Sequence, residues 1–206
     1  MPAANGRPPF RADHVGSLLR PAALKEARAR HARGEINAAA LHAVEDREIA
    51  RIIARQEAVG LKSVTDGEFR RSWWHLDFLW GLAGTERYAM QEGIAFAGVQ
   101  TRAEGVRVVG KLGFAGHPML EHFKFLAAHS KQTAKMTLPA PSAMYGRLGR
   151  GPISTAAYPR LDEFFADLGA AYCKAVRAFA DAGCRYLQLD DVFMVMLCDE
   201  AYRAKQ

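Results

Sequence analysis

The sequence predicts an α/β protein built on a parallel β-sheet that is wrapped by helices. A unit of amphipathic helix, glycine turn and short apolar strand ending in carboxylates occurs at residues 57–68 and again at 180–191. Repeated helix-to-strand units are typical of parallel sheets. In a barrel of such units, the C-terminal ends of the strands meet on one face. We therefore expect Glu68 and Asp190, which end these strands, to share a pocket.

Several core strands are expected, each leading toward a helix. They are residues 10–15, 62–66, 106–112, 133–138 and 185–190. A closed barrel of eight strands needs about 250 residues, whereas this chain has 206. The pattern therefore indicates either a smaller open sheet or an incomplete TIM (β/α)8-type barrel, with about five of eight strands present.

Long helices are expected between these strands. They span residues 22–33, 38–59 and 161–179. Asn37 is a suitable N-cap for the second helix, and Gly60 is a suitable C-terminal stop. The third helix carries the clearest apolar stripe at helical spacing in the whole sequence.

The connecting segments are expected to be short or irregular. Residues 16–21 read as a loop, residues 72–82 as an aromatic loop or short helix, and residues 94–99 as part of a hairpin excursion. Prolines stop strand pairing, so residues 139–142 should form a rigid loop at the end of a strand.

The composition fits a globular enzyme. Half of the chain is hydrophobic, at 50%, and 24% is charged, which is ordinary for a folded domain. Apolar runs are far shorter than the about 20 residues that cross a bilayer, and residues 1–9 lack the apolar core of a signal peptide. We expect a flexible N-terminus over 1–9, a folded part over 10–206, no membrane partner and a cytoplasmic location.

The net charge of +6 does not predict nucleic-acid binding, because the basic residues are scattered and form no stripe with interleaved aromatics. Solvated helix faces or an anionic small substrate explain the excess. Cys173, Cys184 and Cys198 show neither CxxC spacing nor a disulfide framework, and we expect buried free thiols. The histidines lack metal-ligand spacing, so no metal site is expected in this chain.

Residues 66–71 place two carboxylates and two guanidinium groups at a strand exit. The carboxylates of Asp66 and Glu68 could hold an amino group or act as a base, and Arg70 could hold a carboxylate or phosphate. A salt-bridged turn, in which Gly67 serves only the backbone, is an equally good interpretation.

Other strand ends carry polar groups. The strand before Asp190 is apolar, so this carboxylate is a candidate for function, whereas Asp191 could simply cap a helix. His14, Gly16 and Ser17 follow the first expected strand, and backbone N–H groups there could receive a substrate carboxylate. A histidine satisfied by hydrogen bonds, and aromatic residues that belong to the core, are the alternatives for His14 and for the group around Trp74.

Taken together, the segments at residues 14–21, 65–71, 138–142 and 188–191 resemble the cobalamin-independent methionine synthase family, in particular its short single-barrel members. The segments occur in the family's order and at similar separations. The resemblance implies a (β/α)8 barrel that transfers a methyl group from 5-methyltetrahydrofolate, usually polyglutamylated, to homocysteine in methionine biosynthesis. It also implies Zn2+, which activates the homocysteine thiol, and no cobalamin.

The resemblance also implies roles for individual residues. Ser17 and the backbone of Gly16 would receive the homocysteine carboxylate, and Glu68 and Asp190 would bind its ammonium group. The remaining candidates are expected further from the substrate or on the folate side: His14, Asp66, Arg70, Trp74, Pro141, Ser142 and Asp191.

The chain departs from the family in its zinc ligands. The family's His-x-Cys pair, glutamate and further cysteine lie on later strands that this sequence does not contain, so it is similar to the N-terminal portion of the barrel. We expect an apolar sheet edge that self-associates or binds a completing polypeptide. A truncated product, a split enzyme, alkyl transfer to another thiol and a non-catalytic binding fragment all stay open.

Overall fold

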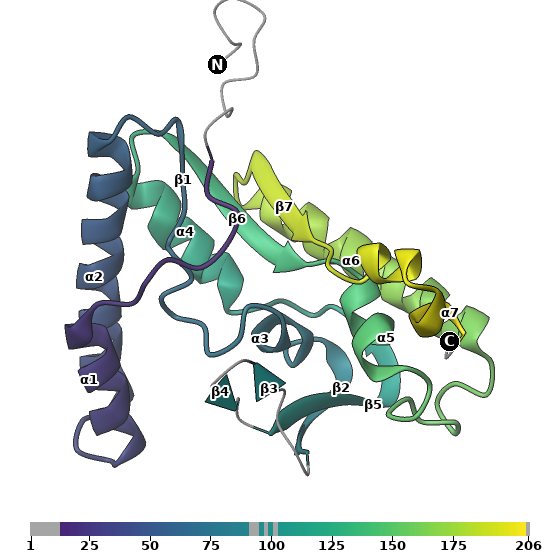
Figure 1. Ribbon diagram of the computed structural model, residues 1–206. Coiled ribbons are helices and arrows are strands. Elements are labelled where there is room, and N and C mark those ends of the chain that lie inside the picture. Colours follow the sequence, from purple (N-terminus) through teal and green to yellow (C-terminus); the bar gives the residue numbers. More distant parts are fainter. Residues whose placement is uncertain (1–12, 91–94, 97–98, 101–102, 205–206) are drawn as a thin grey trace, which may run out of the picture. The chain divides into compact units, whose positions relative to one another are not determined.

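A computed structural model of the protein describes residues 13–90, 95–96, 99–100 and 103–204, so the expected flexible segment 1–9 lies outside it. The chain is a mixed α/β protein with three small sheets (Figure 1). Its contacts define two compact units. Unit 1 holds the described residues up to 71 with 119–137 and 179–188, and unit 2 holds those in 72–118, 138–178 and 189–204.

Unit 1 contains α1 (Ala22–Ala32), α2 (Ala38–Ala58) and α4 (Met119–His129). Helices α1 and α2 confirm the predictions for 22–33 and 38–59, whereas α4 lies in a segment for which no helix was predicted. The Asn37 side chain accepts a hydrogen bond from the Ala40 N–H at 2.9 Å, as expected of an N-cap. Gly60, just past the end of α2, has φ +90°, a conformation that glycine adopts without strain.

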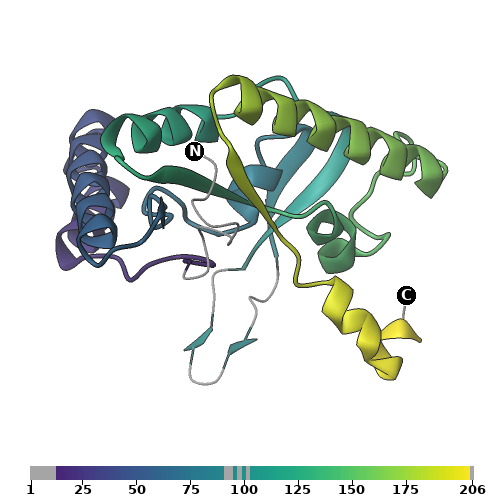
Figure 2. The same ribbon diagram turned by 90° about the horizontal axis from the view of Figure 1, so that it is seen from above.

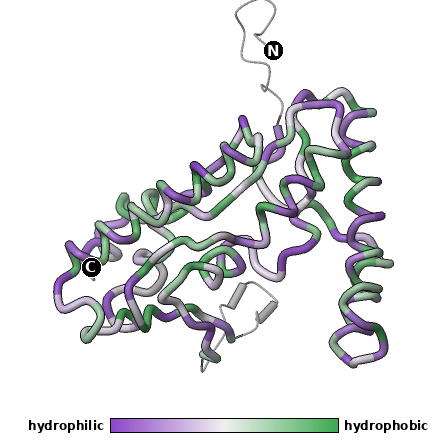
Figure 3. Tube along the Cα trace, turned by 180° about the vertical axis from the view of Figure 1, so that it is seen from behind, coloured by the Kyte–Doolittle hydropathy of each residue, from purple (hydrophilic) through white to green (hydrophobic). Residues whose placement is uncertain are grey.

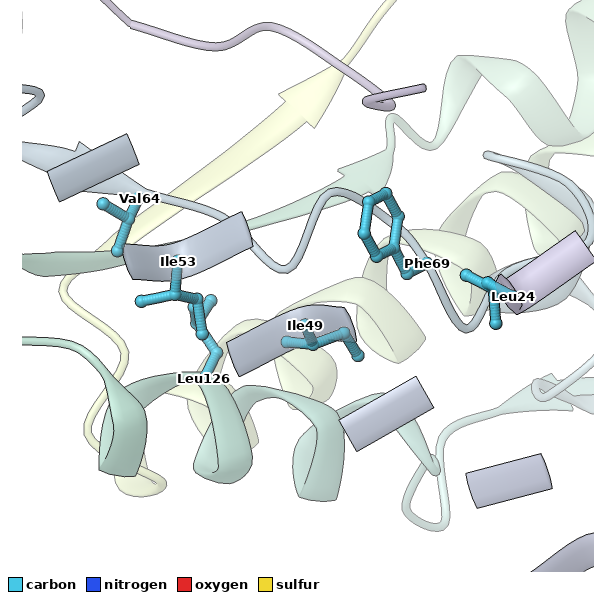
Figure 4. Close-up of a cluster of buried hydrophobic side chains, with 6 residues drawn as sticks. All are labelled: Leu24, Ile49, Ile53, Val64, Phe69 and Leu126. Carbon is cyan, nitrogen blue, oxygen red and sulfur yellow. The ribbon is translucent and has the colours of Figure 1, made fainter. Parts of the chain in front are cut away.

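Apolar side chains from these helices form one core in unit 1. Ile49 and Ile53 of α2 pack with Leu126 of α4, and Leu24 of α1 closes one end (Figure 4). Phe69 joins this cluster from the turn that follows the first strand, and it is 1% exposed. The core therefore fixes the position of that turn on α1 and α2.

One sheet contains β1 (Ser63–Val64), β6 (Thr133–Pro139) and β7 (Tyr186–Asp190), in the order β1-β6-β7. Strands β1 and β6 are parallel, with Ser63 opposite Thr133. These strands confirm the predictions for 62–66, 133–138 and 185–190, although β1 is shorter than expected.

The predicted strand at residues 10–15 is wrong for residues 13–15, the part of it that the structure describes. Residues 13–15 have no regular structure, and residues 10–12 lie outside the described ranges. Side chains take the place of a strand ladder here. The His14 carbonyl accepts from Lys135 Nζ, and the Val15 carbonyl accepts from Gln188 Nε2 at 2.8 Å.

Unit 2 contains antiparallel pairs. Strand β2 (Ala83–Ala89) pairs with β5 (Glu104–Gly113), and β3 (Ala95–Phe96) pairs with β4 (Val99–Gln100). The assignment of residues 106–112 to the core parallel sheet is therefore wrong. Buried Val106 and Val108 alternate with exposed Arg107, and this alternation is typical of an antiparallel ribbon with one wet face.

The helices of unit 2 include α3 (Leu76–Leu79), which confirms a short helix within 72–82, and α5 (Ser142–Leu148). Helix α6 (Leu161–Asp181) confirms the clearest predicted stripe and ends in residues of unit 1. Its alternating hydrophobic and hydrophilic residues can be followed in Figure 3. The expected rigid loop at 139–142 is short, because Pro139 ends β6 and Ser142 begins α5.

After β7 the chain forms η1 (Met194–Cys198), a 3₁₀ helix, and α7 (Glu200–Arg203) (Figure 2). Several apolar side chains of this region are exposed, including Val195 at 68%. The prediction of buried thiols holds only for Cys184, since Cys173 and Cys198 are exposed.

Among the described residues, the sheet therefore contains three strands where about five core strands were expected, and the incomplete TIM-type barrel stays a prediction. No helix in the described part of the chain is long and apolar enough to span a bilayer.

Candidate functional site

The turn that follows β1 has an unusual backbone. Gly67 has φ +65°, and a Cβ on it would lie 2.9 Å from the Phe69 ring, so only glycine fits. Glu68 has φ +58° and is the single non-glycine residue with positive φ in the described ranges. Asp66 Oδ1 accepts the Glu68 N–H at 2.8 Å. Such a conformation costs about 1–3 kcal/mol and is typical of functional sites.

The Glu68 carboxylate is buried, at 3% exposure, and three donors of unit 1 fix it. Thr137 Oγ1 donates to Oε1 at 3.0 Å, and Arg71 donates to the same oxygen at 3.2 Å. The Ser17 hydroxyl donates to Oε2. Because a carboxylate accepts about four hydrogen bonds, Glu68 keeps capacity for one further donor, such as an ammonium group.

The loop at 16–21 brings Ser17 to this carboxylate. The Leu18 N–H donates to the Gly67 carbonyl at 3.1 Å, which ties the loop to the turn. Gly16 and Ser17 are both exposed. A buried carboxylate thus lies beside an exposed hydroxyl and exposed backbone, an arrangement suited to a small zwitterionic ligand.

Arg70 and Asp66 belong to the support of the turn. Arg70 donates to Glu45 at 3.2 Å and also to Asp46, both on α2. Ion pairs therefore surround the turn, as the salt-bridged interpretation expects, but Arg70 pairs with α2 and Asp66 bonds the Glu68 backbone.

Sequence reasoning missed a polar network next to the loop. Lys135 Nζ, in a fully buried side chain, donates to Asp13 Oδ2 at 2.7 Å. Tyr186 donates to the same oxygen at 2.6 Å, and Ser63 donates to Oδ1 at 2.8 Å. This network joins residue 13, just before the Ser17 loop, to all three strands of the sheet. A lysine in the middle of the predicted core strand 133–138 was the available signal.

The network shifts the acidities of its members. Burial raises the pKa of Asp13, but the hydrogen bonds from Lys135, Tyr186 and Ser63 outweigh it, and the pKa lies below its ordinary value. The hydrogen bond to Asp13, with burial, raises the pKa of Tyr186 to about 12. Asp13 is therefore held as a carboxylate and Tyr186 as a neutral donor at neutral pH.

Asp13 should contribute to acid denaturation. Its pKa in the folded chain is lowered from the value of about 3.9 in an unfolded chain. The stabilisation is therefore complete above the unfolded value and is lost as the pH falls through the folded value. In an Asp13→Asn variant, the free energy of unfolding should fall less steeply between about pH 5 and pH 2. Urea titrations across this range measure the slope, and an unchanged slope would contradict the assignment.

Asp190 and Asp191 lie in unit 2. Asp190 is half-buried at the end of β7, and its carbonyl accepts the Ala140 N–H at 2.8 Å. Asp191 is exposed, and its Oδ1 accepts the N–H groups of Phe193 and Met194, each at 3.0 Å. This is the geometry of a carboxylate that caps the start of η1. The predicted pocket shared by Glu68 and Asp190 stays a prediction.

The other candidates of unit 2 lie at the start of α5 and next to α3. Pro141 and Ser142 are both half-buried, and Ser142 is the first residue of α5. The Trp74 ring lies 4.5 Å from the His75 ring, centroid to centroid, and the nearby Phe78 is fully buried. Packed aromatics fit the core interpretation, and a stacking role for Trp74 stays a prediction.

The sequence resemblance implies zinc ligands on strands outside this sequence, so the residues present are not expected to form that zinc site. Within the described ranges, no group of three or more histidine, cysteine or carboxylate side chains is placed to hold a metal ion.

Two proteins of Bacillus subtilis (strain 168) are similar to this chain in sequence. The uncharacterized protein YxjH is 50% identical over 185 residues, which are 89% of this chain and 48% of YxjH. The uncharacterized protein YxjG is 46% identical over 196 residues, which are 94% of this chain and 51% of YxjG. The chain thus spans about half the length of the curated relatives it matches. No family model matches the sequence.

Two solved structures are similar to this chain in fold. A Listeria monocytogenes protein described as a proposed vitamin-B12-independent methionine synthase is 42% identical, with a TM-score of 0.77. The match covers 93% of this chain and 55% of that protein. A B12-independent methionine synthase from Shewanella sp. W3-18-1, in complex with selenomethionine, is 20% identical with a TM-score of 0.60, over 81% of this chain and 48% of that one. The second likeness shows the fold alone. The fold is therefore related to that of methionine-synthase-like proteins.

Proposed function

We propose that this chain is the amino-acid-binding, N-terminal portion of a cobalamin-independent methionine-synthase-type methyltransferase barrel. The observation that carries the proposal is the Ser17–Glu68 pair, a buried carboxylate in a strained turn beside an exposed hydroxyl. The likeness to the Listeria structure supports the choice of family.

In this proposal, homocysteine binds through its charged amino-acid end. Glu68 accepts a hydrogen bond from the ammonium group. The carboxylate is received by the Gly16 N–H and by Ser17, whose single hydroxyl proton turns from Glu68 to the ligand. Asp190 is proposed as the second acceptor of the ammonium group. Pro141 and Ser142 are proposed to lie toward the methyl donor, 5-methyltetrahydrofolate. The protein's contribution is orientation, which converts a reaction between two solutes into one within a complex.

The proposed reaction is a methyl transfer in the completed enzyme. The homocysteine sulfur attacks the methyl carbon, an S–C bond forms, and the N–C bond of the folate breaks. The thiol gives up its proton, and the electron pair of the broken bond stays on the folate nitrogen, which takes up a proton. The residues that activate the thiol are proposed to lie outside this chain.

Thermal unfolding of the 206-residue chain tests the binding step. Ligand at about 100 times its Kd stabilises the native state by about 2.7 kcal/mol and raises the midpoint. Homocysteine should raise it, and so should homoserine, because both carry the amino-acid end. The matched control is 4-mercaptobutyrate, which keeps the thiol and carboxylate but lacks the ammonium group and should leave the midpoint unchanged. A cooperative transition that homocysteine does not shift would reject the proposal.

A non-catalytic binding role is the second candidate for the 206-residue chain. In this role the chain binds homocysteine at Ser17 and Glu68 without turning it over. Methyl transfer by the purified chain with added Zn2+ would reject this candidate. Competition by other thiols would separate homocysteine from a different acceptor.

A further inference from the structure

Two arginines hold the backbone of the turn that carries Glu68. Arg20 donates from one guanidinium nitrogen to the carbonyls of Glu68 and Arg71, each at 2.9 Å. Arg28, on α1, donates to the Arg71 carbonyl at 2.9 Å and to the Phe69 carbonyl at 2.5 Å. Three carbonyls of one short turn therefore accept charge-assisted hydrogen bonds.

The conformation of Glu68 explains the need for this support. At φ +58° a glutamate is strained, and such a residue keeps its conformation only when its surroundings over-determine it. The Glu68 N–H is fixed by Asp66 at 2.8 Å, but the carbonyls on the other side of the turn need donors. Arg20 and Arg28 supply them.

Glu45 fixes the direction of one of these arginines. Its carboxylate, 6% exposed, lies 3.5 Å from Arg28 and 3.2 Å from Arg70. Glu45 lies on α2 and Arg28 on α1, so the helix pair that forms the core also carries one donor of the turn and the carboxylate that pairs with it. None of these groups needs to touch a ligand to act.

We infer that Arg20 and Arg28 are positioning residues that hold Glu68 in its left-handed conformation and thereby aim its carboxylate at the ligand. The part of this inference that concerns homocysteine rests on the proposed function. The part that concerns the backbone of the turn does not. Loss of either guanidinium should release the turn while the core of α1, α2 and α4 stays packed.

Amide hydrogen exchange on the ligand-free chain tests the backbone component. In Arg20→Met and Arg28→Met, exchange at Glu68 and Arg71 should accelerate about tenfold or more, because a hydrogen bond to a charged group is lost. Amides at Ile49 and Ile53 should be unchanged. Arg20→Lys keeps the charge and should restore part of the protection. Arg30→Met is the matched control, since Arg30 is on α1 but pairs with Glu35, away from the turn.

Homocysteine titrations of the same variants test the ligand component. The Kd should rise about tenfold in Arg20→Met and Arg28→Met, less in Arg20→Lys, and not at all in Arg30→Met. Unchanged exchange at Glu68 and Arg71 would overturn the inference, whatever the titrations give. Faster exchange with an unchanged Kd would overturn the positioning role. If exchange is faster in the variants but the unmodified chain does not bind homocysteine, the result would support the role of the arginines in fixing the turn and reject the proposed function.

Discussion

Replacing Lys135 with methionine should lower the free energy of unfolding by about 3 kcal/mol, the lower end of the range for breaking a buried ion pair. The variant leaves the Asp13 carboxylate, 16% exposed, without its cation. Tyr186 and Ser63 still donate to Asp13, which is why we expect the lower end. Methionine has a similar shape, so the loss reports the ion pair with Asp13 together with the hydrogen bond to the His14 carbonyl. Urea unfolding at neutral pH measures it.

Two further variants make this test specific. Lys124 is 55% exposed and pairs with Glu121 on the surface of α4, and Lys124→Met should cost about 0–1 kcal/mol. Asp13→Asn combined with Lys135→Met should be more stable than the sum of the single changes predicts, because the unpaired charge is removed. If Lys135→Met were no worse than Lys124→Met, the network would not stabilise the fold.

Changing Glu68 to glutamine should weaken homocysteine binding by about 10- to 100-fold, since a hydrogen bond between charged groups becomes one to a neutral amide. The amide fills the same space and can still accept from Arg71 or Thr137. Calorimetric titration of homocysteine measures the change. The matched control is Glu35→Gln, an exposed acid that pairs with Arg33 and should leave the affinity unaltered.

The affinity of the Glu68→Gln variant for homocysteine must be interpreted together with the stability of its fold. Arg71 is 2% exposed and loses an ionic acceptor in Glu68→Gln, so the midpoint of thermal unfolding should be recorded for each variant. Equal affinity in a folded Glu68→Gln protein would remove Glu68 from the proposed site. Ser17→Ala should give a smaller loss than Glu68→Gln, because a neutral hydroxyl contributes less than a charge.

The sequence predicted most of the helical structure, because helices depend on a pattern within one segment. The stripe of α6 and the cap at Asn37 are examples. Strand partners depend on distant residues, and an alternating run such as 106–112 does not say which strand will pair with it. The contact of Asp13 with Lys135 joins residues 122 positions apart, and no local pattern specifies it.

The candidate site was predicted only in part, because local motifs specify its residues but not the distant contacts that support them. The motifs placed Ser17 and Glu68 at one ligand, and these residues are in direct contact. The left-handed backbone of Glu68 was not foreseen, since glutamate has no preference for it. The dependence of that backbone on Arg20 and Arg28 is visible only once α1 lies against the turn.

The strained turn limits how this protein can change over generations. Glycine at position 68 would relax the backbone, but it would also strip Arg71 and Thr137 of a shared acceptor. A lineage under selection for heat tolerance therefore has no simple single step at this position. It must gain stability elsewhere or give up the carboxylate together with its neighbours.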